Sequence, residues 1–133
     1  MTGIDTNVLV RYITRDHAEQ YSAAKQHLES TCTQENPGSV SVIVLCELAW
    51  VLSRAYDADP NDIAQVIDQI LRTRQLQVQR RDQVRSALAE YVDHEADFAD
   101  CLIGQLNQTN GADETVTFDQ NAARLRHWQK LDW

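Results

Sequence analysis

Short segments of β-type residues alternate with longer helical segments along this 133-residue chain. Thr115-Val116-Thr117-Phe118 is β-branched and aromatic, and Leu76-Gln77-Val78 alternates apolar and polar side chains, so both segments favour strands. The segment that follows Pro60 instead repeats apolar residues at helical spacing: Ile63, Val66, Ile67, Ile70 and Leu71. Strands that alternate with helices predict an α/β sandwich around a mostly parallel central sheet.

Local start and stop signals give the expected bounds of these elements. Pro60 stands at a first helical position, and Asn110-Gly111 is a helix stop. Asp16, with Glu19 three residues later, has the pattern of a capping box in which Asp16 is the N-cap. The predicted strands are residues 3–5, 39–42, 76–78, 115–118 and an edge strand at 130–133. The predicted helices are residues 6–13, 17–30, 43–56, 60–71, 81–92, 97–110 and 121–128.

The length predicts a single domain over residues 1–133, large enough to bury roughly two thirds of its unfolded surface. Glu47 interrupts the longest apolar run, which falls short of the ~18 residues that span a bilayer. The opening residues 1–5 lack the basic and apolar regions of a signal peptide, so we expect a cytoplasmic protein. The three cysteines lack zinc-type spacing, and two are expected to be buried thiols: Cys46 and Cys101.

The formal net charge of −8 conceals a segregated arrangement of charges. Residues 86–119 hold eight acids and no lysine or arginine. Basic residues lie on both sides of this stretch: Arg72, Arg74, Arg80, Arg81 and Arg85 before it, and Arg124, Arg126 and Lys130 after it. Most of these residues would also suit solvated helix faces. The negative total argues against indiscriminate nucleic-acid coating, whereas the segregation allows an acidic centre with basic flanks.

Glu47 lies inside the most apolar stretch of the chain, residues 43–52. On a helix its same-face neighbours at three and four residues cannot pair with a carboxylate: Ile43, Val44, Trp50 and Val51. A buried charge without a partner would cost several kcal/mol, so we expect Glu47 to have one. An arginine such as Arg54, a hydrogen-bond network and a metal ion are the three alternatives.

Four carboxylates are predicted to converge at one edge of the sheet. Asp5 and Asp119 each close a predicted strand, Glu47 follows the second strand, and Asp100 lies one turn into the helix before the fourth. Parallel sheets place their sites at the carboxyl ends of the strands. An all-oxygen site of this kind suits Mg²⁺ or Mn²⁺.

Three of the four acids also have an ordinary structural explanation when taken alone. Asp5 or Thr6 could cap the first helix, and Asp119 could be a turn residue. Asp97 and Asp100 could be a first-turn pair favoured by the helix dipole. The positions of the acids in combination, rather than any single one, indicate a site.

Four blocks of the sequence resemble the PIN domain and, more narrowly, the VapC-type toxins of bacterial and archaeal toxin–antitoxin pairs. The blocks are Ile4-Asp5-Thr6-Asn7-Val8-Leu9-Val10-Arg11-Tyr12, Cys46-Glu47-Leu48, Asp97-Phe98-Ala99-Asp100-Cys101-Leu102-Ile103 and Thr117-Phe118-Asp119. The resemblance spans essentially the whole chain, with the acids in order. It implies a three-layer α/β/α sandwich with a mostly parallel central sheet of four or five strands. Cys101 stands where a small apolar residue is common, which leaves the acids intact.

The resemblance implies a Mg²⁺- or Mn²⁺-dependent endoribonuclease with a catalytic and metal-binding set of Asp5, Glu47, Asp100 and Asp119. Asp5 and Asp100 would be direct metal ligands, and Glu47 would ligate directly or through water or help to deprotonate the attacking water. Asp97 would be an accessory acid. Thr6, Asn7 and Thr117 occupy positions that orient the acids or a water. The family also implies a homodimer and a cognate VapB-like antitoxin that covers the acidic pocket.

RNA binding requires local positive charge, because phosphate affinity comes largely from Lys and Arg. We hypothesise that Arg11 and Arg15 contact RNA phosphates, with some of Arg72, Arg74, Arg80 and Arg81. The main alternative function is a catalytically inactive PIN-fold module that binds RNA or protein.

Two other α/β classes fit the sequence less well. A phosphoacceptor receiver domain needs a lysine near its pocket, and neither Lys25 nor Lys130 follows a suitable core strand. A haloacid-type phosphohydrolase needs a second acid two residues after its nucleophilic aspartate, where this chain has Asn7.

Overall fold

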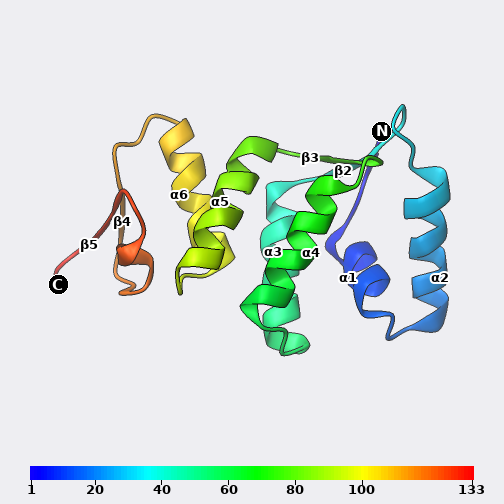
Figure 1. Cartoon of the computed structure of the whole chain (residues 1–133), viewed down its shortest axis with the longest axis horizontal. Coiled ribbons are helices and arrows are strands. Elements are labelled where there is room, and N and C mark those ends of the chain that lie inside the picture. Colours follow the sequence, from blue (N-terminus) through cyan, green and yellow to red (C-terminus); the bar gives the residue numbers. More distant parts are fainter. The chain divides into compact units, whose positions relative to one another are not determined.

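The computed structural model describes residues 1–133, which divide into two compact units, Met1–Gln79 (unit 1) and Arg80–Trp133 (unit 2). Figure 1 shows the ribbon of both units with the six helices and most of the strands labelled. The elements of unit 1 are β1 (Thr2–Gly3), α1 (Thr6–Thr14), α2 (Ala18–Gln26), the π-helical turn η1 (His27–Thr31), β2 (Gly38–Val40), α3 (Val42–Ala55), α4 (Pro60–Arg72) and β3 (Leu76–Val78). The elements of unit 2 are α5 (Arg81–Asp93), α6 (Phe98–Thr109), β4 (Thr115–Thr117), the 3-10 turn η2 (Ala122–Arg124) and β5 (Trp128–Lys130).

Unit 1 is built on a parallel three-stranded sheet in the order β1-β2-β3. Gly38 pairs with Thr2 on one side and with Leu76 on the other. A β-carbon at Gly38 would lie 2.9 Å from Cγ1 of Ile4 and 3.1 Å from Cδ2 of Leu76. The central strand therefore begins with a residue that leaves room for side chains from its neighbours.

The helices of unit 1 follow from their caps and apolar faces. Asp59 accepts a hydrogen bond from the backbone N–H of Asp62 and starts α4, with Pro60 at its first position as predicted. Ser41 caps α3 in the same way through the N–H of Val44. Helix α1 packs against α2 and α3, and α3 packs against α4 (Figure 1). The core that these helices bury includes Leu9, Leu45, Leu48, Leu52 and Ile67.

Unit 2 consists of the helix pair α5 and α6 and a parallel two-stranded ladder of β4 and β5. The rings of Tyr91 on α5 and Phe98 on α6 meet edge to face, with centroids 5.9 Å apart. Thr115 pairs with Trp128 and Thr117 with Lys130. Three predicted site acids lie in unit 2: Asp97 and Asp100 at the N-terminus of α6, and Asp119 after the carboxyl end of β4.

The α/β class and the parallel pairing are confirmed, and five strands are present. The strands form a three-stranded and a two-stranded sheet, which differs from the single sheet that we expected. The last helix, expected over 121–128, is only the turn η2, and the last strand begins at Trp128 instead of Lys130. No helix in the structure has the length and apolar character needed to cross a membrane.

The capping box predicted at Asp16 is wrong. The N-cap of α2 is His17, whose Nδ1 accepts a hydrogen bond from the backbone N–H of Gln20 at 3.1 Å. Asp16 instead accepts from the hydroxyl of Tyr56 at 2.6 Å and forms an ion pair with Arg11 at 3.0 Å. The local pattern predicts that the Asp16 carboxylate caps α2, but it binds Tyr56, 40 positions away, instead.

Candidate acidic active site

The first acidic group lies in unit 1, where β1 ends. The chain runs from β1 through the buried Ile4 to Asp5, whose extended backbone (φ −82°, ψ 157°) precedes α1. Asp5 is the N-cap of α1, and its Oδ1 accepts a hydrogen bond from the N–H of Thr6 at 2.9 Å. The cap places an exposed carboxylate at the positive end of a helix, where negative charge is favoured.

Glu47 joins this group through Thr6. The hydroxyl of Thr6, the one buried polar residue of the chain, donates a hydrogen bond to Oε1 of Glu47 at 2.7 Å. Thr6 thus contacts both acids of unit 1, Asp5 through its backbone N–H and Glu47 through its side chain. Because Thr6 is buried in the first turn of α1, it fixes one oxygen of Glu47 relative to the end of β1.

The expectation that Glu47 is a buried charge is wrong. Glu47 lies on the exposed side of α3, and its neighbours on that side, Ile43 and Trp50, are 69% and 61% exposed. The apolar residues that surround it in sequence point to the opposite, buried face of α3: Val44, Leu45, Leu48, Ala49 and Leu52. Glu47 forms no ion pair with Arg54. The guanidinium of Arg54 instead lies 6.0 Å from the centre of the Trp50 ring.

Asn7 follows Thr6 on α1 and points away from this group. With Gly3, Ile4 and Arg11 it lines a cavity of about 580 Å³ whose far wall comes from α2. Neither Asp5 nor Glu47 lines that cavity. The structure therefore brings Asp5, Thr6 and Glu47 together and leaves Asn7 beside a separate cavity.

The second acidic group lies in unit 2 and consists of Asp97, Asp100 and Asp119. Asp97 is the N-cap of α6, and Asp100 follows in its first turn. Burial raises the pKa of the Asp100 carboxyl above its ordinary value of 3.8, and the negative charges of Asp97 and Asp119 raise it further. The three predicted acids of unit 2 are thus close enough to interact electrostatically.

Asp119 is held by the turn that follows β4. Its backbone N–H donates a hydrogen bond to Oγ1 of Thr117 at 3.0 Å, and its Oδ1 accepts one from the N–H of Asn121 at 3.3 Å. Its carbonyl oxygen accepts from the N–H of Ala123 at the start of η2. Thr117 therefore positions the Asp119 backbone through its side chain, and Asp119 is both a turn residue and a member of the acidic group.

The donor atoms of the two groups suit a hard divalent cation. Both groups offer carboxylate oxygens, with a threonine hydroxyl beside each, and no imidazole or thiolate belongs to either. The structure contains no preformed metal site, that is, no group of three or more metal-ligating side chains that could hold an ion. Burial is the main cause of the raised pKa of Asp100, and the negative charges of Asp97 and Asp119 add to it. A cation would offset those two charges, so the carboxylates of unit 2 suit such an ion.

The thiols are not candidates for a nucleophile. Burial raises the pKa of Cys32, Cys46 and Cys101, in the last case to about 12. Cys101 is fully buried beside Asp100, and Cys46 is half-buried beside Glu47. Both remain protonated thiols at neutral pH, which leaves the carboxylates as the reactive groups of these two blocks.

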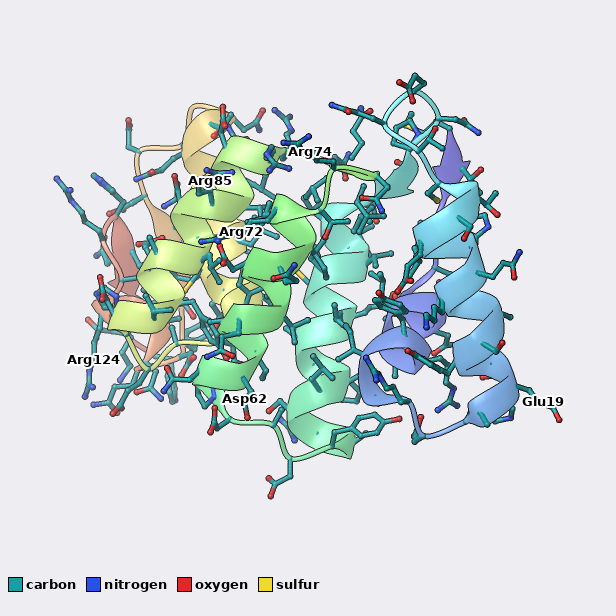
Figure 2. The ribbon with its side chains drawn as sticks, turned by 45° about the vertical axis from the view of Figure 1, so that its right-hand side comes forward. Glu19, Asp62, Arg72, Arg74, Arg85 and Arg124 are labelled. Atoms are coloured by element: carbon teal, nitrogen blue, oxygen red, sulfur yellow. The ribbon has the colours of Figure 1, made fainter.

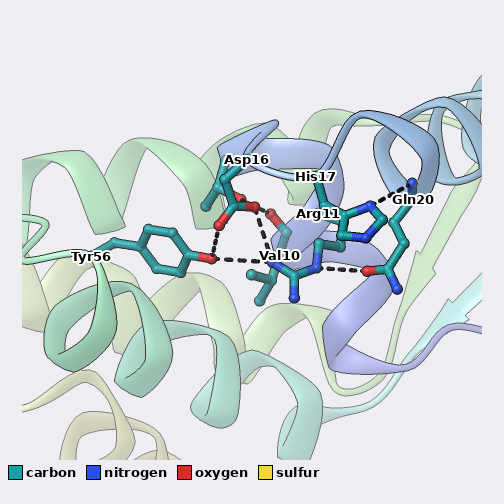
Figure 3. A network of polar contacts seen from close by, with 7 residues as sticks. Val10, Arg11, Asp16, His17, Gln20 and Tyr56 are labelled. Atoms are coloured by element: carbon teal, nitrogen blue, oxygen red, sulfur yellow. Dashed lines mark hydrogen bonds and ion pairs between the residues drawn. The ribbon is translucent and has the colours of Figure 1, made fainter.

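The two arginines proposed for RNA binding have different environments. Arg11 donates to Gln20 through Nε at 2.7 Å and to Asp16 through Nη1 at 3.0 Å, next to the hydroxyl of Tyr56 (Figure 3). Arg15 has an exposed side chain, and its guanidinium lies 5.0 Å over the ring of Tyr21. The charge of Arg11 is therefore already balanced by Asp16, whereas Arg15 is accessible to a phosphate.

Arg72, the last residue of α4, and Arg74 shortly after it are both exposed (Figure 2). Arg72 forms a helical ion pair with Asp68 at 3.0 Å, in which the Arg72 side chain is 73% exposed. An ion pair as exposed as this one competes weakly with a phosphate.

Comparison with known proteins assigns the class of the molecule. The family model of the PIN domain matches residues 4–127, and the chain belongs to the PIN domain family. It is also similar to a protein named VapC ribonuclease from Aquifex aeolicus (strain VF5). The two are 26% identical over 125 residues, which cover 94% of this chain and 92% of that protein.

Proposed function

We propose that this chain is a divalent-metal-dependent endoribonuclease that acts as the toxin of a VapBC-type toxin–antitoxin pair. Membership of the PIN family and similarity to a VapC ribonuclease support this function. The observation that carries it is the placement of Asp97 at the N-cap and Asp100 in the first turn of α6, where the charges of Asp97 and Asp119 add to the effect of burial in raising the pKa of Asp100. Acids that repel one another are typical of functional sites that a cation completes.

We propose further that residues 1–133 form one domain and that its catalytic acids are Asp5, Glu47, Asp100 and Asp119. The supporting observation is that both groups follow the carboxyl ends of parallel strands, Asp5 after β1 and Asp119 after β4. Sites of α/β proteins are found at such strand ends. The family model spans both units, which supports their assignment to one domain.

Each residue has a defined role in this proposal. Asp5, Asp100 and Asp119 would hold Mg²⁺ or Mn²⁺, with Asp97 as an accessory acid. A cation bound there would polarise the phosphodiester and lower the pKa of an attacking water. Glu47 would accept the proton of that water through Oε2, because Thr6 holds Oε1. The water oxygen forms the new bond to phosphorus as the bond to the leaving oxygen breaks.

The remaining predicted residues position this machinery or the RNA. Thr117 fixes the turn that carries Asp119, whereas Asn7 lines the cavity beside α2 and has no role at the acids. Arg15 would contact a phosphate directly. Arg11 would contribute less, because Asp16 already neutralises it.

We also propose a homodimer, a VapB-like antitoxin as the cognate partner and a cytoplasmic location, which the similarity to VapC supports. The alternative is a PIN-fold module that binds RNA or protein without cleaving RNA. The presence of all four acids favours the enzyme.

The test uses the purified chain with defined single-stranded RNAs in Mg²⁺, in Mn²⁺ or in a chelator. Asp5→Asn and Glu47→Gln should abolish cleavage, and chelation should do the same. Asp113→Asn is a matched control, since Asp113 is an exposed acid of unit 2 outside both groups. Cleavage that survives chelation, or that survives both substitutions, would overturn the proposed function. Light scattering on the same samples measures the oligomeric state.

A further inference from the structure

Two exposed aromatic rings lie together at one end of the β4–β5 ladder. Phe118 follows β4 and is 57% exposed, and Trp133 is 90% exposed. Their ring centroids are 5.2 Å apart at an interplanar angle of 80°. Nζ of Lys130 lies 5.8 Å from the centroid of the Trp133 ring. We call these three residues the aromatic platform.

The ladder explains why residues far apart in sequence meet here. Thr117 pairs with Lys130, and the backbone N–H of Leu131 donates to the carbonyl of Thr117 at 2.8 Å. The chain therefore leaves both strands at the same end, so that the residues after β4 lie beside those after β5. Asp119 follows Phe118 directly and leaves β4 at that same end. The aromatic platform thus borders one of the proposed catalytic acids.

The rings are not used to fill a core. Aromatic side chains gain most of their stabilisation from burial, and these two leave most of their surface in solvent. Val116 and Leu131, each two residues before one of the rings in sequence, are also exposed. An edge-to-face contact covers only one ring face, and Lys130 lies over one face of Trp133, so open faces remain. Exposed apolar surface of this kind marks an interaction site.

The charge of the aromatic platform identifies the occupant. Lys130 adds a cation beside the rings, and the exposed acid Asp132 lies between Lys130 and Trp133 in sequence. An unpaired nucleotide presents a flat base to stack on a ring and a phosphate for a cation, which is how proteins bind single-stranded RNA. A purely apolar protein partner would not use the lysine.

We propose that Phe118 and Trp133 stack an unpaired base of single-stranded RNA and that Lys130 contacts the adjacent phosphate. The placement rests on the proposed function, because it assigns the base to a nucleotide that flanks the cleaved bond near Asp119. The consequence is that an unpaired base beside the scissile phosphate would add to RNA affinity through these two rings.

Binding to a fluorescently labelled single-stranded RNA tests the aromatic platform without relying on cleavage. The measurements use Asp100→Asn protein, which cannot consume the probe. In this background Phe118→Leu and Trp133→Leu should each weaken binding roughly 5- to 100-fold, the range for loss of one stacked base. Trp133→Tyr keeps a ring and should restore most of the affinity. Duplex RNA should compete poorly for the protein.

Salt dependence separates the ring contacts from the phosphate contact. Lys130→Gln should reduce the slope of log affinity against log salt by about 0.7, and Trp133→Leu should leave the slope unchanged. Trp50→Leu, which removes an exposed tryptophan of unit 1, is the matched control and should bind like the parent.

The outcomes distinguish this proposal from the proposed function. Wild-type affinity in both leucine variants would overturn the aromatic platform even if the enzyme cleaves RNA. Loss of binding in those variants would support it even if the wild type cleaves nothing. A changed oligomeric state with unchanged RNA affinity would assign the rings to a protein interface and overturn RNA stacking.

Discussion

The hydroxyl of Thr6 donates a hydrogen bond to Oε1 of Glu47, across 2.7 Å and between residues 41 positions apart. Thr6 also begins α1, where its N–H meets the capping carboxylate of Asp5. One buried threonine therefore positions both acids of unit 1. A threonine at this place does more than start a helix, and its two contacts can be removed separately.

Thr6→Val keeps the shape of the side chain and the N–H contact with Asp5 but removes the hydroxyl. We expect a loss of roughly 10- to 100-fold in RNA cleavage, the usual cost of removing a group that orients a catalytic ligand. The free energy of unfolding should fall by only about 1 kcal/mol, since Glu47 is exposed and can turn to water. Thr6→Ser should retain most activity. Equal cleavage rates for the valine and serine variants would contradict the orienting role.

Asp100→Asn should make unit 2 more stable in the absence of divalent ions at neutral pH. A carboxyl with a raised pKa contributes stability fully below its ordinary value of 3.8, and this contribution is lost as pH rises through the folded pKa. The asparagine has no charge to repel Asp97 and Asp119. The greater stability of Asp100→Asn should therefore appear only above pH 3.8, where the wild-type carboxyl ionises. Thermal melts from pH 3 to pH 8 measure the difference.

Divalent ions should reverse this order. Mg²⁺ or Mn²⁺ should raise the melting temperature of the wild type, because it binds the folded state, and should have little effect on Asp100→Asn. A wild type that is more stable than Asp100→Asn at pH 7 without metal would contradict repulsion among these acids.

Tyr56→Phe should destabilise unit 1 in a pH-dependent way. The hydroxyl of Tyr56 is the main cause of the lowered pKa of Asp16, which falls from 3.8 to about 2. A lowered carboxyl pKa gives stability that is present above the ordinary value and lost as pH falls through the folded pKa. The gap between wild type and Tyr56→Phe should therefore narrow between pH 4 and pH 2. Urea unfolding followed by circular dichroism measures it, and a gap independent of pH would contradict the contact.

Gly104→Ala should destabilise unit 2 by about 1–3 kcal/mol, the typical cost of overpacking. A β-carbon at this position of α6 would collide with the indole nitrogen of Trp128 on β5. Gly3→Ala is the matched control, because nothing lies within 4 Å of a β-carbon there. Chemical denaturation of both variants provides the comparison, and similar losses would show that β5 does not pack closely on α6.

Elements with strong local signals were predictable from the sequence. Asp59 and Pro60 define the start of α4 by themselves, and the helix begins where they indicate. The prediction failed where a distant residue decides the outcome. Asp16 matches a capping pattern, but Tyr56 and Arg11 bind it, and His17 takes the cap. The bounds predicted for strand β5 are wrong because its pairing with β4 sets them. A strand of three residues has too short a sequence pattern to indicate which residues pair.

The sequence predicted which acids belong to the two groups better than it predicted how buried each acid is. Asp97, Asp100 and Asp119 interact in unit 2, and Asp5 and Glu47 share Thr6 in unit 1. The apolar sequence around Glu47 indicated burial, whereas the helix turns those residues to its other face. Residues adjacent in sequence lie on different faces of a helix. An apolar sequence around an exposed residue therefore makes that residue look more buried than it is.

The three tryptophans are divided between the units, Trp50 in unit 1 and Trp128 and Trp133 in unit 2. A chain that keeps only Trp50 therefore reports by fluorescence on the unfolding of unit 1, and one that keeps only Trp128 reports on unit 2. Coincident unfolding midpoints would mean that the two units melt as one cooperative body, as a single domain requires. Separate midpoints would mean that one unit unfolds while the other stays folded, and RNA cleavage should then be lost at the lower of the two midpoints.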